Sequence, residues 1–184
     1  MGRDKAWLLL DGRPIIEHII GELRQVTREI TIIANDPDYS RLGLPFVGDV
    51  NLGIGPLEAI RTALANSGAG WTILIGCDLP FVTAELLQFM LDRAEGYQAV
   101  VPRGPDDRLQ PLCAAYSSEA LDPVSRLITS GERKVSPLFD QLQTRVVSFE
   151  ELRHLGGSER FFVNVNTPDD YARALELARR RESG

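Results

Sequence analysis

Apolar residues along the chain follow two alternating patterns. Short continuous runs, such as 30–34 and 71–76, contain several β-branched residues and predict buried strands. Between such runs, apolar residues recur every three or four positions, which is typical of a helix with one buried face. The first helix is predicted to begin near Pro14, and its apolar stripe consists of Ile15, Ile16, Ile19, Ile20 and Leu23.

The same patterns continue to the C-terminal end. An apolar run at 7–10 is closed by the turn pair Asp11-Gly12. Strands are predicted at 30–34, 45–48, 71–76, 98–102, 112–116, 144–149 and 161–165. Helices are predicted at 57–64 and 119–128, after the cap residue Thr83, and after Thr167, where Pro168 and two acids complete a helix start.

Alternating strands and helices predict an α/β fold with a mostly parallel sheet covered on both faces. In such sheets, ligands bind outside the carboxyl ends of the strands. Asn35, Asp49 and Asp78 each come just after a predicted strand. We therefore expect these three side chains to share one edge of the sheet.

The composition narrows the class of protein. A chain of 184 residues with 43% hydrophobic and 25% charged residues predicts one globular domain over 1–184. The net charge of −6 argues against nucleic acid and membrane surfaces as partners. We find no apolar run of membrane-spanning length and no charged-then-apolar leader, and the distant Cys77 and Cys113 are typical of buried free thiols. These features predict a cytoplasmic protein.

Asp78 is the strongest candidate for chemistry. It follows the most apolar strand and precedes Leu79-Pro80, which disfavours a helix at that point. A carboxylate at a strand end can hold Mg²⁺ against nucleotide phosphates. An aspartate that bonds its own backbone in a turn explains the local sequence equally well. Asp49 is a similar but weaker candidate, because its strand is shorter.

Other polar positions carry weaker signals. The loop Gly53-Ile54-Gly55-Pro56-Leu57 leads into a helix and could approach an anion, although an ordinary loop explains it better. Lys5 is most simply a surface lysine. Asn164 and Asn166 alternate at the end of a predicted strand, so their side chains should point the same way. Basic residues in loops, which solvent alone would explain, are Arg103, Arg108, Arg133 and Lys134.

Taken in order, these segments resemble the molybdenum cofactor guanylyltransferases, a family of MobA-like nucleotidyltransferases. Met1-Gly2-Arg3-Asp4-Lys5 resembles the end of the family's glycine-rich pattern Gly-Gly-x-Ser-x-Arg-Met-Gly-x-Asp-Lys. Further matches are Gly12-Arg13-Pro14-Ile15, Gly55-Pro56-Leu57, Cys77-Asp78-Leu79-Pro80-Phe81, Gln110-Pro111-Leu112-Cys113-Ala114, Gly131-Glu132-Arg133-Lys134-Val135 and 162–169. The last, Phe-Val-Asn-Val-Asn-Thr-Pro-Asp, is the most specific for this family.

The resemblance implies a three-layer, Rossmann-like nucleotidyltransferase fold and a set of roles. Lys5 would neutralise the phosphates of GTP, Asp78 would hold Mg²⁺ and Asp49 would contact the nucleotide. The family uses an asparagine near the end of the second strand for guanine, where this chain has Ile33. Asn35, two residues later, is the substitute.

The implied reaction transfers GMP from GTP to the phosphate of molybdopterin and releases pyrophosphate. Asn164 and Asn166 would position the pterin-bearing substrate, and the product would pass to a molybdoenzyme or its chaperone. Two alternatives stay open: a pterin cytidylyltransferase or sugar-phosphate nucleotidyltransferase, and a degenerate relative that binds a nucleotide without turnover.

The resemblance also carries an expectation about the start of the chain. The family pattern places a buried strand and the Gly-Gly-x-Ser-x-Arg loop before the position of Met1. We expect the first strand of the fold to be missing from this chain, the native protein to begin upstream of Met1, and the 184-residue form to be impaired.

Overall fold

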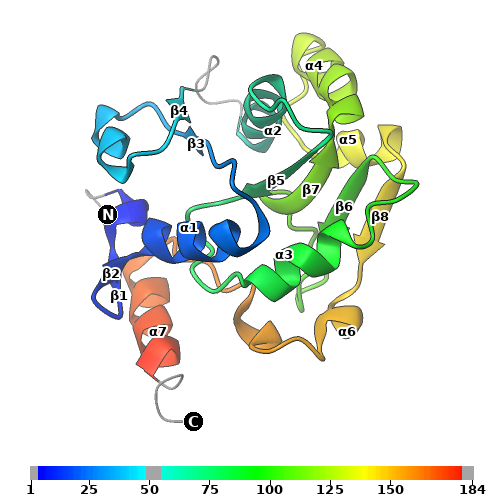
Figure 1. Cartoon of the computed structure of the whole chain (residues 1–184). Helices are drawn as coiled ribbons and strands as arrows, with labels where there is room; N and C mark the ends of the chain where they lie inside the picture. The colour runs from blue at the N-terminus through cyan, green and yellow to red at the C-terminus, as the bar shows by residue number, and fades with distance from the viewer. Residues whose placement is uncertain (1–3, 49–54, 180–184) are drawn as a thin grey trace. The chain divides into compact units, whose positions relative to one another are not determined.

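Alternating strands and helices do form along the chain (Figure 1). The structure is a computed structural model that describes residues 4–48 and 55–179. The described residues of Met1–Arg28, Ile75–Gln88 and Glu150–Gly184 make up a first compact unit, and those of Glu29–Leu74 and Phe89–Phe149 a second. The expectation of one domain over 1–184 stays a prediction, and each unit is described by itself.

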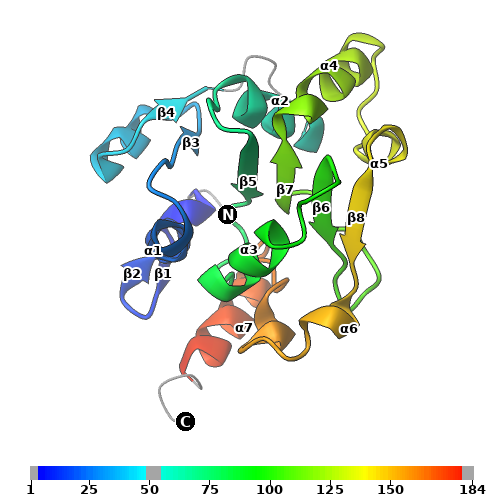
Figure 2. The same ribbon diagram turned by 45° about the vertical axis from the view of Figure 1, so that its right-hand side comes forward.

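The sheet of the second unit has four strands. In spatial order they are β5 (Trp71–Ile75), β7 (Cys113–Ser117), β6 (Ala99–Pro102) and β8 (Thr144–Val147) (Figure 2). Strand β6 runs parallel to β8 and antiparallel to β7. The predicted α/β class is confirmed, and the sheet is mixed rather than wholly parallel, because β7 returns directly beside β6.

One face of this sheet is covered by three helices, α2 (Pro56–Ala65), α4 (Leu121–Thr129) and α5 (Ser136–Gln141). Alternate residues of β6 and β7 point into this layer because side chains alternate between the faces of a strand. The main members of the core are Leu57, Ile60, Leu64, Ala99, Val101, Ala114, Tyr116, Val124, Leu127 and Leu138. Val100 and Ala115, which point the other way, are equally buried, as a sheet with two covered faces requires.

A second, smaller pair of strands lies in the same unit. β3 (Ile32–Ile33) and β4 (Phe46–Val47) run parallel, and the 3-10 helix η2 (Pro37–Leu42) connects them. The Ala34 amide donates to the Val47 carbonyl at 2.9 Å, so the pairing continues to the carboxyl ends of both strands. Two of the strands predicted from apolar runs, 30–34 and 45–48, are therefore confirmed.

The first unit begins with a helical turn and a hairpin. η1 (Lys5–Trp7) leads into β1 (Leu9–Leu10), which pairs antiparallel with β2 (Arg13–Pro14). Asp11 and Gly12 form the two-residue turn, and both have positive φ, at 48° and 74°. This is the backbone that a tight hairpin needs, and aspartate and glycine tolerate it best. α1 (Ile15–Val26) follows, and its predicted apolar stripe is buried apart from Leu23, which is half-buried.

Helices and turns complete the chain. They are α3 (Ala84–Leu91), η3 (Ser118–Ala120), α6 (Phe149–Leu152), η4 (Ser158–Arg160) and α7 (Pro168–Arg179). Thr83 caps α3 as expected, with its hydroxyl accepting from the Leu86 amide at 3.3 Å. No helix among the described residues is both long and apolar enough to cross a lipid bilayer.

The strand expected at 161–165 does not form. Residues 161–162 make a turn, which the Val163 amide closes on the Arg160 carbonyl at 3.0 Å, and 163–166 belongs to no helix or strand. Its Val165 amide makes a single long-range bond, to the Asp78 carbonyl at 2.9 Å. The alternation of apolar and polar residues here comes from packing Phe161 and Val165 inward, not from a sheet.

Candidate active site

Lys5 is held in a turn that Asp4 begins. The Asp4 carboxylate accepts from the Ala6 amide at 3.0 Å, and the Leu8 amide donates to the Lys5 carbonyl at 3.1 Å. Ala6 is fully buried, whereas Lys5 is only half-buried. The backbone of the lysine is thus fixed while its side chain leaves the core.

Asp78 lies just beyond the carboxyl end of β5. A turn closes there, with the Leu79 amide donating to the Gly76 carbonyl at 3.2 Å, and Leu79 and Pro80 are buried. Asp78 itself is half-buried. Within residues 4–48 and 55–179, its carboxylate has no hydrogen-bond or ion-pair partner. The turn is thus anchored by buried residues and leaves the Asp78 carboxylate able to bind a cation.

Asn166 meets Lys5 directly. The Lys5 Nζ donates to the Asn166 Oδ1 at 2.5 Å, although the two residues are 161 positions apart. The preceding residue of this segment, Val165, is bonded to the Asp78 backbone. The structure therefore brings the segment of Asn166 to both Lys5 and the Asp78 turn.

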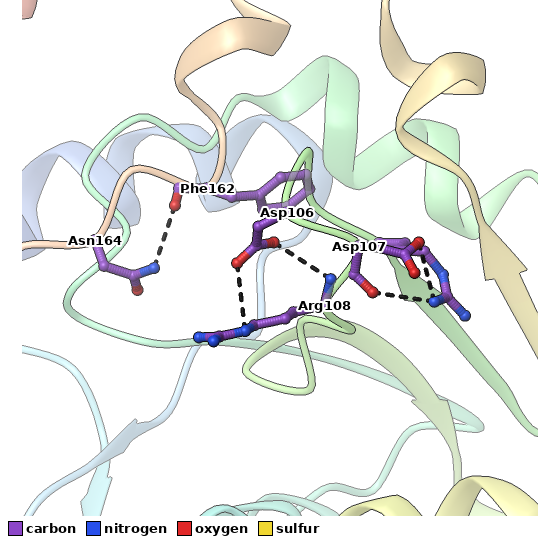
Figure 3. Close-up of polar contacts among 6 residues, drawn as sticks. Asp106, Asp107, Arg108, Phe162 and Asn164 are labelled. Carbon is purple, nitrogen blue, oxygen red and sulfur yellow. Dashed lines mark hydrogen bonds and ion pairs between the residues drawn. The ribbon is translucent and has the colours of Figure 1, made fainter.

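Asn164 does not share the role of Asn166. Its amide nitrogen donates to the Phe162 carbonyl at 3.2 Å, a bond within its own segment (Figure 3). The expectation that both asparagines point the same way assumed a strand with period two, and no strand forms here. A part in binding substrate stays a prediction for both residues.

The thiol of Cys77 reports the charges around this site. Burial of the sulfur by the surrounding protein, followed by the carboxylates of Asp78 and Asp4, raises its pKa from 9.0 to about 11, and Lys5 opposes the rise. The charges of Lys5, Asp4 and Asp78 therefore all influence the Cys77 Sγ. The residue as a whole is exposed, so the expectation of a buried thiol is wrong for Cys77 and confirmed for Cys113. Cys77 lies in the turn after β5. The apolar run before it had suggested that it continues the buried strand.

We expect Cys77 to react slowly for an exposed thiol. At pH 8, a pKa of about 11 instead of 9.0 leaves roughly a hundredfold less thiolate, the form that attacks an alkylating reagent. In a Cys113→Ala background, iodoacetamide should label the folded protein about a hundredfold more slowly than the unfolded protein, with the rate still rising above pH 10. Equal rates at pH 8 would show that burial and the two carboxylates do not raise the pKa of this thiol.

Asn35 and Asp49 belong to the second unit. Asn35 is exposed at the carboxyl end of β3, and its Oδ1 lies against Gly48, where a Cβ would approach it to 2.5 Å. Ile33 is half-buried and pairs with Val47 in the β3–β4 ladder. Asp49 and the first two residues of the glycine loop, Gly53 and Ile54, lie outside the described residues. The next residue, Gly55, precedes α2 with φ 80°, a backbone that favours glycine.

Two of the loop arginines are paired locally. Arg103 contacts the Asp107 carboxylate at 3.2 Å, and Arg108 the Asp106 carboxylate at 3.7 Å, all within one loop (Figure 3). Such exposed pairs contribute little to stability. They do reduce the positive charge that these arginines offer to an anion.

The residues present fit a metal bound partly by substrate. No group of three or more histidine, cysteine, aspartate or glutamate side chains in the described part of the chain could hold a metal ion. Magnesium at nucleotide sites is often held by one or two carboxylates together with substrate phosphates. The Asp78 carboxylate has the chemistry of such a ligand, and its role stays a prediction.

Asp170 is the residue near the site that sequence reasoning missed. Its Oδ2 accepts from the amides of Asn166 and Thr167 at 3.1 and 2.8 Å. The Thr-x-x-Asp spacing that indicates a helix start was the available signal, because an acid at this position reaches back to the residues before the helix.

Comparison with known proteins places this geometry in a family. Residues 1–146 match the model of the MobA-like NTP transferase domain. A probable molybdenum cofactor guanylyltransferase from Pelotomaculum thermopropionicum is 34% identical, over 100% of this chain and 90% of that protein. Another, from Carboxydothermus hydrogenoformans, is 32% identical over 96% and 89%.

Comparison with solved structures indicates the same family. The crystal structure of molybdopterin-guanine dinucleotide biosynthesis protein A from Archaeoglobus fulgidus matches with a TM-score of 0.82 and 28% identity, over 97% of this chain and 92% of that one. The fold is thus that of an α/β nucleotidyltransferase. The chain belongs to the MobA-like NTP transferase family, and within it to the molybdenum cofactor guanylyltransferases.

Proposed function

We propose that this protein transfers GMP from GTP to the phosphate of molybdopterin. The observation that carries the proposal is the meeting of Lys5, Asn166 and the Asp78 turn, in a chain similar along its whole length to molybdenum cofactor guanylyltransferases. A phosphate oxygen of molybdopterin attacks the α-phosphorus of GTP. The bond from that phosphorus to the bridging oxygen breaks, and pyrophosphate leaves with the electron pair.

Both substrates are anionic, so charge is the main obstacle to the reaction. Lys5 offers an ammonium group that offsets the charge of the phosphates and of the leaving group. Asp78 would hold Mg²⁺, which when bound neutralises phosphate charge and stabilises the departing pyrophosphate, and Asp49 would contact the nucleotide. Asn35 would contact the base, while Asn164 and Asn166 would lie near the pterin substrate. No covalent intermediate with the protein is needed.

We infer that the protein acts in the cytoplasm, where a thiol as exposed as that of Cys77 stays reduced. The product would pass to a molybdoenzyme or its chaperone.

The direct test is to incubate the protein with molybdopterin, MgCl₂ and GTP labelled at the α-phosphate. We expect the label in a pterin dinucleotide and one pyrophosphate released for each. Transfer from CTP alone would identify a cytidylyltransferase. Binding of GTP with no transfer to molybdopterin would support a relative without turnover, and either result would overturn the proposal.

We expect GTP to bind more tightly than CTP by at least about tenfold. A site that hydrogen-bonds one base leaves a buried polar group unpaired with another, at about 1–3 kcal/mol. Isothermal titration calorimetry with both nucleotides measures the ratio. Asn35→Ala should narrow it, whereas Asp38→Ala, in the next turn and ion-paired with Arg41, should leave it unchanged. Equal affinities in the unmodified protein would refute guanine recognition.

A further inference from the structure

The first turn of α7 is built around one carboxylate. The Asp170 Oδ2 accepts from the Thr167 amide at 2.8 Å and from the Asn166 amide at 3.1 Å, and the Asp170 amide donates to the Thr167 hydroxyl at 3.1 Å. This reciprocal arrangement is a capping box. It extends one residue further back than usual, because Asn166 precedes the cap residue. The backbone of Asn166 is therefore fixed by Asp170.

The side chain of Asn166 is fixed at its other end by Lys5. Its Oδ1 accepts from the Lys5 Nζ at 2.5 Å. A second bond joins the same two segments, because the Tyr171 hydroxyl donates to the Leu9 carbonyl at 2.6 Å. Figure 1 shows α7 beside β1 and β2, in agreement with this bond. Tyr171 thus bonds directly to the segment of Lys5, while its neighbour Asp170 holds the backbone of Asn166.

We propose that Asp170 is a positioning residue for Lys5, acting through Asn166. The chain of bonds runs from the Asp170 carboxylate to the Asn166 amide, and from the Asn166 side chain to the Lys5 ammonium. A lysine side chain has four methylene groups and loses considerable rotamer freedom when it is held. If the fold has already oriented the ammonium, less of that entropy is lost when phosphates bind.

The state of Asp170 suits this role. A hydrogen bond from the Thr167 side chain, followed by those from the Thr167 and Asn166 amides, holds the pKa of Asp170 below its usual value of 3.8. The carboxylate is therefore ionised throughout the range in which the enzyme would work. Asp170 would not touch substrate itself.

The inference rests on the proposed role of Lys5, so a thermodynamic cycle separates positioning from simple helix capping. We expect Asp170→Ala to weaken GTP binding about tenfold, less than the roughly 10²-fold that a displacement of 1 Å can cost. In a Lys5→Met background, the same change should alter GTP affinity less than twofold. An equal loss in both backgrounds, measured by calorimetry, would mean that Asp170 only caps the helix and would overturn the proposal.

Two variants serve as controls. Asp169→Ala removes the neighbouring acid of the same turn, which takes no part in these bonds, and should leave GTP affinity unchanged. Asp170→Asn keeps an acceptor oxygen and should restore much of the affinity lost in Asp170→Ala. It also keeps the cycle interpretable if the alanine variant folds poorly. Failure of the asparagine variant to restore any affinity, in a folded protein, would count against the proposal.

A measurement without nucleotide distinguishes this proposal from the proposed function. The chain has only two lysines, Lys5 and Lys134, so reductive ¹³C-methylation gives two assignable side-chain signals. A restrained ammonium should show inequivalent methyl groups for Lys5, which merge in Asp170→Ala and stay separate in Asp169→Ala. Merged signals in the unmodified protein would overturn the positioning role even if transfer of GMP is observed. Separate signals that merge in Asp170→Ala would support it even if transfer is not observed.

Discussion

Asp78→Asn should reduce metal-dependent transfer of GMP by at least about a hundredfold and leave the thermal midpoint nearly unchanged. The variant keeps the shape of the side chain and the Asp78 carbonyl that accepts from Val165, so the turn after β5 should be retained. What it removes is the one negative charge that, in our proposal, would face the bound cation. Charge stabilisation by a metal amounts to several kcal/mol, and each 1.4 kcal/mol is a factor of ten in rate.

The measurement is a magnesium titration of the initial rate. Asp11→Asn is the matched control, because this exposed aspartate lies in the hairpin turn with positive φ, which asparagine tolerates equally well. We expect the control to keep its rate and its magnesium dependence. If Asp78→Asn keeps most of its activity at the same magnesium concentration, Asp78 is not the metal ligand.

The sequence predicted the elements whose causes are local. The turn at Asp11-Gly12 was predicted because both residues accept positive φ, and the start of α3 because the Thr83 hydroxyl caps the helix. The strand at 71–76 was equally clear from six residues without a charge. In each case the deciding interaction lies within a few residues.

The strand expected at 161–165 shows the limit of such reasoning. Alternating apolar residues indicate which side chains are buried, and Phe161 and Val165 are indeed buried. They do not indicate whether a neighbouring strand is present to pair with the backbone. Here the backbone makes one long-range bond, from the Val165 amide to the Asp78 carbonyl, and no ladder forms.

The site was predicted as separate residues and not as an arrangement. The roles expected of Lys5 and Asn166 came from the family resemblance and concerned different substrates. Their contact joins positions 161 apart, so no local pattern could reveal it. The bond from the Asn166 amide to Asp170 was missed for a related reason. The capping pattern predicts a helix start, but only the fold shows that Asn166 also contacts Lys5.

Lys5→Met should reduce transfer of GMP by about 10²–10³-fold, the effect typical of removing one group that stabilises charge in a transition state. Methionine keeps the length and apolar body of lysine but removes the ammonium. Lys5 is half-buried and its backbone is held by Asp4, so the fold should lose little stability. We expect kcat to fall more than GTP affinity, because charge on the leaving pyrophosphate develops only during the reaction.

Lys134→Met is the matched control for this change, since Lys134 is the other lysine of the chain and is exposed. It removes the same charge from the protein as a whole, so the control isolates the position of the charge. Lys5→Arg should recover only part of the rate, because a planar guanidinium cannot occupy the place of a compact ammonium that Asn166 holds at 2.5 Å. Comparable losses in Lys5→Met and Lys134→Met, measured as initial rates at saturating GTP, would show that net charge and not Lys5 governs the reaction.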